Sequence, residues 1–251
     1  MNNEAPEPAP TWADILRSRY LLPFYLICGF AISVGILNLW LNGYFGSYSW
    51  RQKLTIEVET PAGPVTGSAV TAVRFFDDNI MVDGAQIKTR FKGEAVTLDL
   101  GRDRYLFALL SHFKAPEYIA WLAPKILWER DGVGGWDAIA KAQSLNTPLA
   151  IPPKHYPMLV TFADINDPKS VKLVDPGNLA ATFGPGYSLK SIALEITEER
   201  VTDGKVENVL AWILELQTRL IPTNKKHAKD YFPVENVGPE YFVFPYRFKE
   251  E

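Results

Sequence analysis

The three histidines, His112, His155 and His227, are the side chains best suited to acid–base chemistry near neutral pH. None stands in an HExxH pattern or beside a cysteine pair, the spacings that are typical of zinc sites. Ser111 precedes His112 directly, but adjacent residues on a helix point in different directions and form no dyad. The single cysteine, Cys28, lies in an apolar stretch. The sequence therefore predicts no catalytic residue, no metal site and no cofactor.

A glycine-rich run, Gly132-Val133-Gly134-Gly135, has the composition of a phosphate-binding loop. No Lys-Ser or Lys-Thr follows it, and Asp131 and Asp137 flank it with charges that repel phosphate. We expect this run to connect two helices.

Two acidic segments have the composition of cation-binding turns. They lack the residue order and the terminal glutamate of an EF-hand loop. Because Asp and Asn side chains also stabilise turns by bonding to nearby backbone, we interpret both as turns, with a weak cation site as the alternative. The residues are Asp77, Asp78, Asn79 and Asp83 in the first segment, and Asp164, Asn166 and Asp167 in the second.

The overall charge is close to balanced, with 26 Lys and Arg against 29 Asp and Glu and a net charge of -3. Nucleic-acid-binding domains normally show a strongly basic composition. This balance predicts that nucleic acid is not a partner.

Residues 20–41 contain no charged side chain. As a helix the segment would be about 33 Å long, which matches a hydrocarbon core of about 30 Å. We therefore expect a single transmembrane helix, with the lipid bilayer as a partner. Cleavage near Ser47 and Ser49 and a buried core helix are the alternatives. Aromatic residues after the segment are predicted to lie at the membrane interface; they are Trp40, Tyr44, Phe45, Tyr48 and Trp50.

Basic residues set the expected orientation of this span. Arg17 and Arg19 lie immediately before it, whereas Arg51 and Lys53 follow some distance after it. The positive-inside rule then places the N-terminus in the cytoplasm and the main domain on the periplasmic or extracytoplasmic side.

Small residues inside the span are spaced so that another helix can approach closely. We predict association through this face with another membrane protein or with a second copy, although such residues are also common in membrane helices. The predicted helix-packing residues are Cys28, Gly29, Ala31, Ser33, Gly35 and Asn38.

Alternating apolar residues after the span predict strands over 53–60, 65–76, 80–82, 86–91 and 95–100. Turns are expected at 61–64, at 77–79, at Asp83-Gly84 and at Lys92-Gly93. A helix is then expected from Asp103, with Leu106, Phe107 and Leu110 on one face. A second is expected from Pro116 and would be kinked or shortened at Pro124, and a third over 136–145.

Strands resume over 158–163, 171–174 and 189–197, followed by a helix over 206–220 and a closing strand over 241–248. This order predicts an α+β fold after a single N-terminal transmembrane helix. We expect an antiparallel β-meander or sandwich-like sheet with several helices, and not a doubly wound parallel sheet.

The expected organisation has three parts. Residues 1–19 form a disordered or juxtamembrane cytoplasmic segment, 20–41 the transmembrane helix, and 42–251 a soluble extracytoplasmic domain. The proline-rich stretch 148–157 is a candidate sub-boundary, which we interpret as a rigid loop.

Several aromatic residues between 118 and 136 are candidates for a docking surface, with packing in the core as the alternative. They are Tyr118, Trp121, Trp128 and Trp136.

The topology of a span followed by strands resembles that of membrane-anchored serine peptidases of the signal-peptidase type. In that family the nucleophile follows the membrane in a Ser-Met-x-Pro context, with a lysine base downstream. Ser47 and Ser49 stand in the corresponding place, but their context is GSYSWRQ, which lacks the Met and the Pro. The resemblance is confined to topology.

These observations favour a membrane-anchored extracytoplasmic protein that acts as a non-catalytic interaction module or as an accessory subunit of a membrane complex. One alternative is a membrane-anchored hydrolase whose site is assembled from distant residues. The other is a lipid- or glycan-binding envelope module, which predicts an apolar cavity in the β-rich part.

Overall fold

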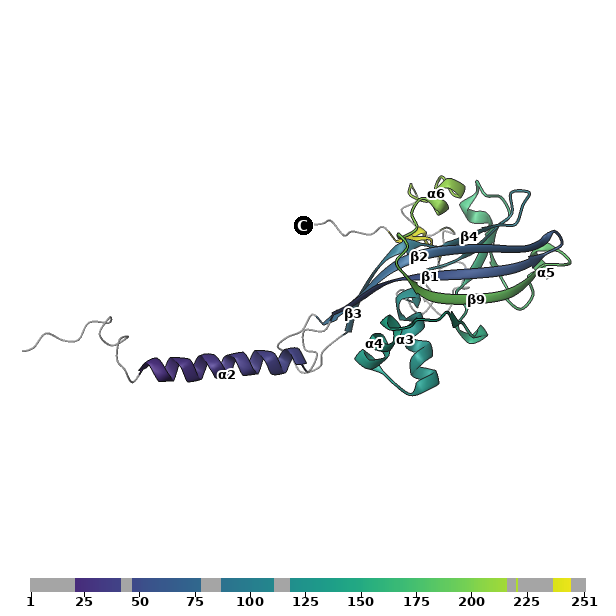
Figure 1. Ribbon diagram of the computed structural model, residues 1–251. Helices are drawn as coiled ribbons and strands as arrows, with labels where there is room; N and C mark the ends of the chain where they lie inside the picture. The colour runs from purple at the N-terminus through teal and green to yellow at the C-terminus, as the bar shows by residue number, and fades with distance from the viewer. Residues whose placement is uncertain are drawn as a thin grey trace, which may run out of the picture. The chain divides into compact units, whose positions relative to one another are not determined.

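The computed structural model describes residues 21–41, 47–77, 87–110, 118–215, 220 and 237–244 (Figure 1). The chain divides into two compact units. In the described part, the first unit consists of helix α2 (Leu21–Leu41). The second unit takes residues 47–78 and 86–251.

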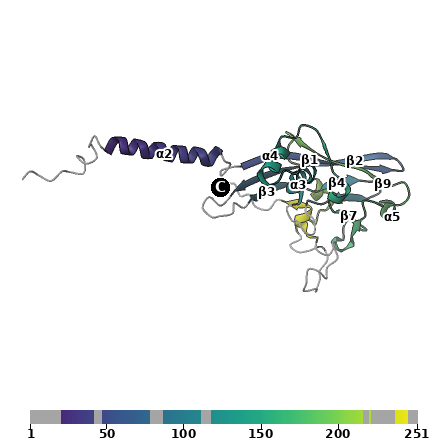
Figure 2. The same ribbon diagram turned by 90° about the horizontal axis from the view of Figure 1, so that it is seen from below.

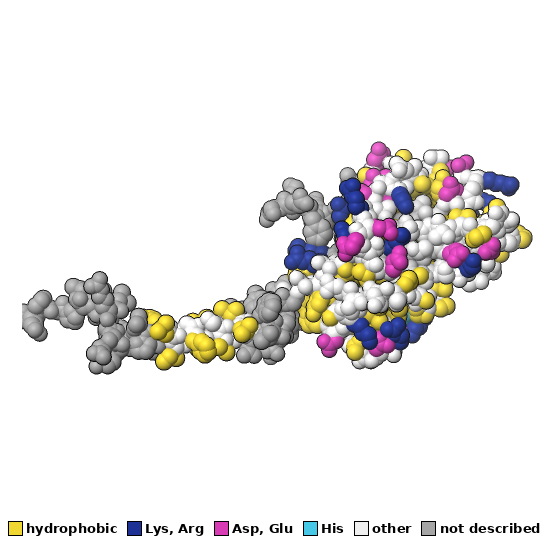
Figure 3. Space-filling view, in the orientation of Figure 1, with side chains coloured by type: hydrophobic (Ala, Val, Ile, Leu, Met, Phe, Trp, Pro, Cys, Tyr) yellow, Lys and Arg dark blue, Asp and Glu magenta, His cyan; other side chains and the backbone are white. Residues whose placement is uncertain are grey.

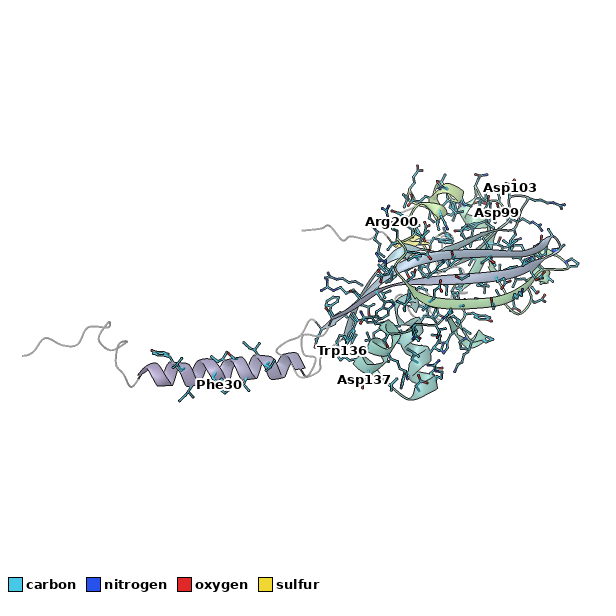
Figure 4. The ribbon with its side chains drawn as sticks, viewed as in Figure 1. Phe30, Asp99, Asp103, Trp136, Asp137 and Arg200 are labelled. Carbon is cyan, nitrogen blue, oxygen red and sulfur yellow. The ribbon has the colours of Figure 1, made fainter. Side chains whose placement is uncertain are left out.

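Helix α2 is built from apolar residues, and its side chains are described from Tyr25 to Leu37. Its large apolar side chains are exposed, from 39% at Val34 to 73% at Phe30, which is labelled in Figure 4. Within the described residues, no helix combines the length and the hydropathy that crossing a membrane requires. The membrane span over 20–41 therefore stays a prediction.

The second unit is organised around a six-stranded antiparallel sheet in the order β10-β3-β2-β1-β9-β6 (Figure 1). Strands β1 and β2 form a long hairpin, and the turn between them is held because Thr60 Oγ1 donates to the carbonyl of Gly63 and accepts from the amide of Ala62. The strands are β1 (Ser47–Thr60), β2 (Gly63–Asp77), β3 (Ile87–Glu94), β6 (Leu149–Ala150), β9 (Ser188–Thr197) and β10 (Val243–Phe244).

A second antiparallel sheet has the order β4-β5-β7-β8 and lies behind the first in Figure 1. Leu106 and Ala108 of β5 pack into the same core as the inner face of β1, whereas Phe107 packs into a second core with Phe242. Strand β5 is therefore buried on both faces. Its strands are β4 (Val96–Asp99), β5 (Tyr105–Ala108), β7 (Leu159–Phe162) and β8 (Val171–Val174).

Helices α3 and α4 cover the inner face of the large sheet beside β1 (Figures 1 and 2). Gln52, which is fully buried, joins α3 to the sheet, because its Nε2 donates to the carbonyl of Ile119 at 2.7 Å. The helices are α3 (Tyr118–Asp131), α4 (Gly135–Gln143), α5 (Ala180–Phe183) and α6 (Lys205–Val209), with 3₁₀ turns η1 (Pro153–His155), η2 (Pro168–Ser170) and η5 (Pro239–Tyr241).

The predicted α+β class with antiparallel sheets is confirmed. The hairpin, the strands near 86–91 and 95–100, the helix over 136–145 and the strands after 158 are also confirmed, with small changes in their ends. The expected strand over 80–82, the start of the helix at Pro116 and residues 245–248 lie outside the described residues.

The helix predicted from Asp103 is wrong, because Tyr105–Ala108 forms strand β5. A strand that is covered on both faces needs no polar residues. Its sequence therefore does not alternate between apolar and polar residues, which is the pattern by which strands are predicted. The turn predicted at Lys92-Gly93 is also wrong, since both residues lie within β3.

The helix predicted over 206–220 is wrong in extent, since α6 ends at Val209. The apolar residues at helical spacing are buried in the second core although the helix ends early. They are Val206 in α6 and Leu210 and Ile213 in the turns that follow it. The shortening predicted at Pro124 does not occur, because α3 continues through this residue to Asp131.

Glu94 fixes the start of α6. Its side chain is 1% exposed, and its two carboxylate oxygens accept from the backbone amides of Lys205 (3.0 Å) and Val206 (3.1 Å). Burial disfavours the ionised carboxylate and raises its pKa, although the two amide bonds partly oppose this shift.

We predict that Glu94 makes stability depend on pH. Because its pKa is higher in the folded state, the folded chain binds more protons than the unfolded chain, and Glu94 stabilises less as pH rises from about 4 to 7. Unfolding in urea should show wild type losing stability relative to Glu94→Gln across this range. Glu195→Gln is the control, since the side chain of Glu195 on β9 is 40% exposed. A difference between wild type and Glu94→Gln that is constant with pH would contradict the assignment.

Candidate functional site

The outer face of the large sheet gathers basic side chains at the end where β1 begins. Even-numbered residues of β1 from Trp50 to Thr60 are buried, so the odd-numbered residues point outward. The strand register then sets outward residues of β1, β2 and β3 in three rows: Arg51–Ala72–Lys92, Ser49–Arg74–Arg90 and Ser47–Phe76–Lys88. We call Arg51, Arg74, Lys88, Arg90 and Lys92 the basic face.

A groove of about 570 Å³ lies on this face. Ala72 forms its floor, because its short side chain stands between Arg51 on one neighbouring strand and Lys92 on the other. Arg74, Arg90 and Ser49 extend the lining, and Glu198 and Val201 form a wall.

Residues 198–202, the crossing segment, build that wall. The segment leaves the end of β9 and reaches β2, where the amide of Thr202 donates to the carbonyl of Val70 at 3.0 Å and Thr202 Oγ1 accepts from the amide of Val70 at 2.8 Å. Glu198 pairs with Arg51, and Glu199 pairs with Lys53 at 2.7 Å. The groove is thus bounded by backbone that is fixed to the sheet.

The electrostatics of the groove favour an anion. Glu198 is the acidic side chain in the lining, and its side chain is 96% exposed, so its pair with Arg51 is screened by water. Within the described residues, Arg74 and Lys92 have no ion-pair partner. The ring centre of Phe76 lies 4.8 Å from the guanidinium of Arg90 and 5.9 Å from that of Arg74. Guanidinium groups bind phosphate or carboxylate in a bidentate manner.

Acidic residues also lie on the same face, further along β1 and β9, where lysines accompany them. Glu57 and Glu59 point outward from β1, and Glu195 points outward from β9. Lys190 pairs with Glu57 at 2.8 Å. Figure 3 shows Lys and Arg side chains gathered at the end of the sheet where β1 begins, beside hydrophobic side chains. The small net charge of the chain therefore does not show that the cations of the basic face gather at one end of the sheet.

The residues predicted to pack against another helix lie on α2. Gly29, Ala31, Ser33 and Gly35 are exposed, and Cys28 is half-buried. A methyl group added at Gly29 or Gly35 would meet no atom within 4 Å, and Ser33 Oγ donates to the carbonyl of Gly29 at 2.8 Å. The side chains of Asn38 and Trp40, and the whole of Tyr44 and Phe45, lie outside the described part of the chain.

Two further residues predicted at the membrane interface belong to β1. Trp50 is 7% exposed, stacks on Phe75 at 5.3 Å and donates its Nε1–H to Gln52. Trp50 is therefore a core residue and not a surface residue. Tyr48 is half-buried, and its ring centre lies 5.9 Å from that of Trp136 on α4, which Figure 4 labels.

The candidate docking aromatics are mostly engaged in the core. Tyr118 is buried and donates its hydroxyl to the carbonyl of His155. Trp121 packs edge-on to Phe75 at 4.9 Å, and Trp136 is half-buried. Trp128 is 58% exposed and is the member of this set that remains on the surface.

His155 is buried, with its Nε2 2.9 Å from Glu129 Oε2, and Lys154 Nζ lies 2.5 Å from the same oxygen. The hydrogen bonds from Lys154 and His155 lower the pKa of Glu129 to about 2. An adjoining pocket of about 460 Å³ is lined by this cluster together with apolar residues that include Ile126, Leu149 and Ile151. His112 and His227 lie outside the described residues.

The predicted loops agree with turn chemistry where they are described, except at Asp77, which is the last residue of strand β2. Residues 132–134 connect α3 to α4, as expected. Asp164 Oδ1 accepts from the amide of Asn166, and Asp167 Oδ1 accepts from the amide of Lys169. Asp78, Asn79 and Asp83 lie outside the described residues. In the ranges that the structure describes, no three His, Cys, Asp or Glu side chains come together as a metal site would require.

Sequence reasoning missed the basic face. The available signal was the spacing of cations at every second residue, Lys88, Arg90 and Lys92 in one segment and Arg51 and Lys53 in another. Each spacing places its members on one side of a strand. The pairing register of β1, β2 and β3 was needed to show that these two groups of cations lie on one face.

We predict that the basic face contributes little to stability. Arg74→Gln and Lys92→Gln should each change the free energy of unfolding by less than about 1 kcal/mol, because crowded exposed cations gain little from each other. Arg104→Gln is the contrast, since Arg104 donates to the carbonyl of Phe183 and to the Tyr187 hydroxyl. That change should cost about 1–3 kcal/mol. Denaturant unfolding measures all three, and equal losses would mean that Arg74 has a structural role.

Comparisons with protein-family models, with curated proteins and with solved structures found no match to the chain. The geometry of the site therefore carries the functional interpretation.

Proposed function

We propose that the chain is a membrane-anchored binding module that is not catalytic, held by a span over 20–41 with its main domain on the extracytoplasmic side. The exposed apolar surface of α2 carries this proposal. Its large side chains from Tyr25 to Leu37 lie between 39% and 73% exposed. Water disfavours such a surface at about 25 cal/mol per Å², so it requires either a bilayer or protein to cover it.

The basic face supports binding as the role of the second unit. Arginine side chains stay protonated under all physiological conditions, so they position an anion rather than exchange protons with it. The lipid- or glycan-binding alternative predicted an apolar cavity, whereas the lining of the groove includes four cations, Arg51, Arg74, Arg90 and Lys92, beside its apolar residues. A module that recognises charge at its surface fits this lining better.

The small residues of α2 support association within the membrane. Gly29 and Gly35 leave open space on the helix, and Cys28, Ala31 and Gly35 share one side of it by their spacing. We propose that this side contacts a second copy of the chain, or the helix of a larger membrane complex in which the chain is an accessory subunit.

The membrane anchor is tested by adding a charge to α2. We predict that Ile32→Asp moves the chain from the membrane fraction to the alkali-extractable fraction, because a carboxylate at the centre of a span costs about 3 kcal/mol. Leu173→Asp, at an exposed apolar residue of β8, is the matched control and should leave fractionation unchanged. If alkali fully extracts the wild-type chain from the membrane fraction, the proposed membrane anchor is wrong.

Self-association is tested with the natural cysteine. Mild oxidation of native membranes should cross-link Cys28 to Cys28 of a second copy. The matched control is Leu26→Cys in a Cys28→Ser chain, since residue 26 points to the other side of the helix and is exposed. Cross-linking that is equal at both positions, or absent at Cys28, would rule out a specific dimer through this side.

A further inference from the structure

The basic face is confined to three rows at one end of the sheet. Its cations come from β1, β2 and β3, and they surround the short Ala72 and the ring of Phe76. Beyond the row of Arg51, carboxylates appear on the outer face, and these are Glu57, Glu195 and Glu199, which pair with Lys190 and Lys53. A long polyanion that ran along the face would meet these carboxylates. The site therefore fits compact anionic groups rather than a nucleic-acid strand.

The position of the face along the chain indicates where such groups come from. The row Ser47–Phe76–Lys88 contains the first residue of β1. Residues 42–46 alone connect the proposed span to this row, and an extended chain of that length covers about 20 Å at most. For a chain anchored by this span, the headgroup layer is the nearest dense array of anions.

Aromatic side chains at the same end of the sheet suit such a layer. Phe76 lies on the outer face, with two guanidinium groups near its ring. Tyr48, which is one residue after the start of β1, pairs with Trp136 on the inner side. Aromatic rings with a polar edge favour the headgroup level of a bilayer. This end of the unit thus combines cations with the amphipathic rings of Tyr48 and Trp136 and with the apolar ring of Phe76.

We propose that the basic face binds the phosphate groups of anionic phospholipids and so docks the second unit on the membrane surface. The proposal rests on the proposed membrane anchor. Arg74 and Lys92 contribute most directly, because both are exposed and have no ion-pair partner within the described residues. Each basic residue near an anionic surface shifts the ratio of docked to undocked molecules about fivefold.

The test uses the full chain in nanodiscs of phosphatidylcholine, with or without one quarter phosphatidylglycerol. A fluorophore is attached at Ser49→Cys in a Cys28→Ser chain, and nitroxide-labelled headgroups quench it when the face is docked. Quenching should increase with phosphatidylglycerol and should be lost in high salt. Arg74→Gln with Lys92→Gln should lower the docked-to-undocked ratio about 25-fold. Lys125→Gln with Lys172→Gln, at exposed lysines of α3 and β8, is the charge-matched control.

The outcomes separate this proposal from the anchor. A chain that enters the nanodisc but shows equal quenching in both lipid mixtures keeps the anchor and overturns lipid docking. A chain that does not enter either nanodisc overturns the anchor itself. A fluorophore that responds to inorganic phosphate in phosphatidylcholine discs as strongly as to phosphatidylglycerol assigns the face to a free anion. A fluorophore that responds to polyglutamate alone assigns the basic face to an acidic protein segment. The phosphate result and the polyglutamate result would each overturn lipid docking.

Discussion

The register between β1 and β2 is the constraint on which the rest of the second unit depends. It fixes which residues of β1 enter the core, because a slip by one residue would exchange the two faces of the strand. With Leu54, Ile56 and Val58 inside, Arg51 necessarily points outward beside Ala72. Pairing of β2 with β3 then adds Lys92 and Arg90 to the same rows. The packing of the core and the assembly of the basic face are thus two results of one pairing.

Elements with one solvent-facing side could be predicted from the sequence. β1 alternates Leu54, Ile56 and Val58 with polar residues, and β8 was predicted with its observed ends. β5 could not be predicted, because both of its faces are covered and its run Tyr105–Ala108 shows no alternation. The apolar spacing between Val206 and Ile213 resembled a helix, yet burial in turns satisfies it equally well. Tertiary packing decided these cases, and sequence spacing did not.

The candidate site was less predictable than the fold, because it is made by strands that are distant in sequence. A net charge of -3 suggested no basic surface. The chain instead separates its charges, with Arg74, Arg90 and Lys92 at one end of the outer face and Glu57 and Glu195 further along it. The net charge of the whole chain does not show such a separation. Trp50 and Tyr118 were predicted to lie at an interface, yet both are buried in the core. Aromatic composition alone does not distinguish an interface from a core.

Hydrogen exchange of the full chain in nanodiscs tests the proposed anchor and the proposed docked face in one experiment. Amides inside a bilayer, or beneath a bound headgroup layer, exchange slowly. We expect the amides of residues 21–41 to be strongly protected from exchange in every lipid. We also expect the amides of residues 87–92 to exchange more slowly with phosphatidylglycerol present than in phosphatidylcholine alone. Rapid exchange of residues 25–37 in nanodiscs, as for a helix open to water, would contradict the proposed anchor.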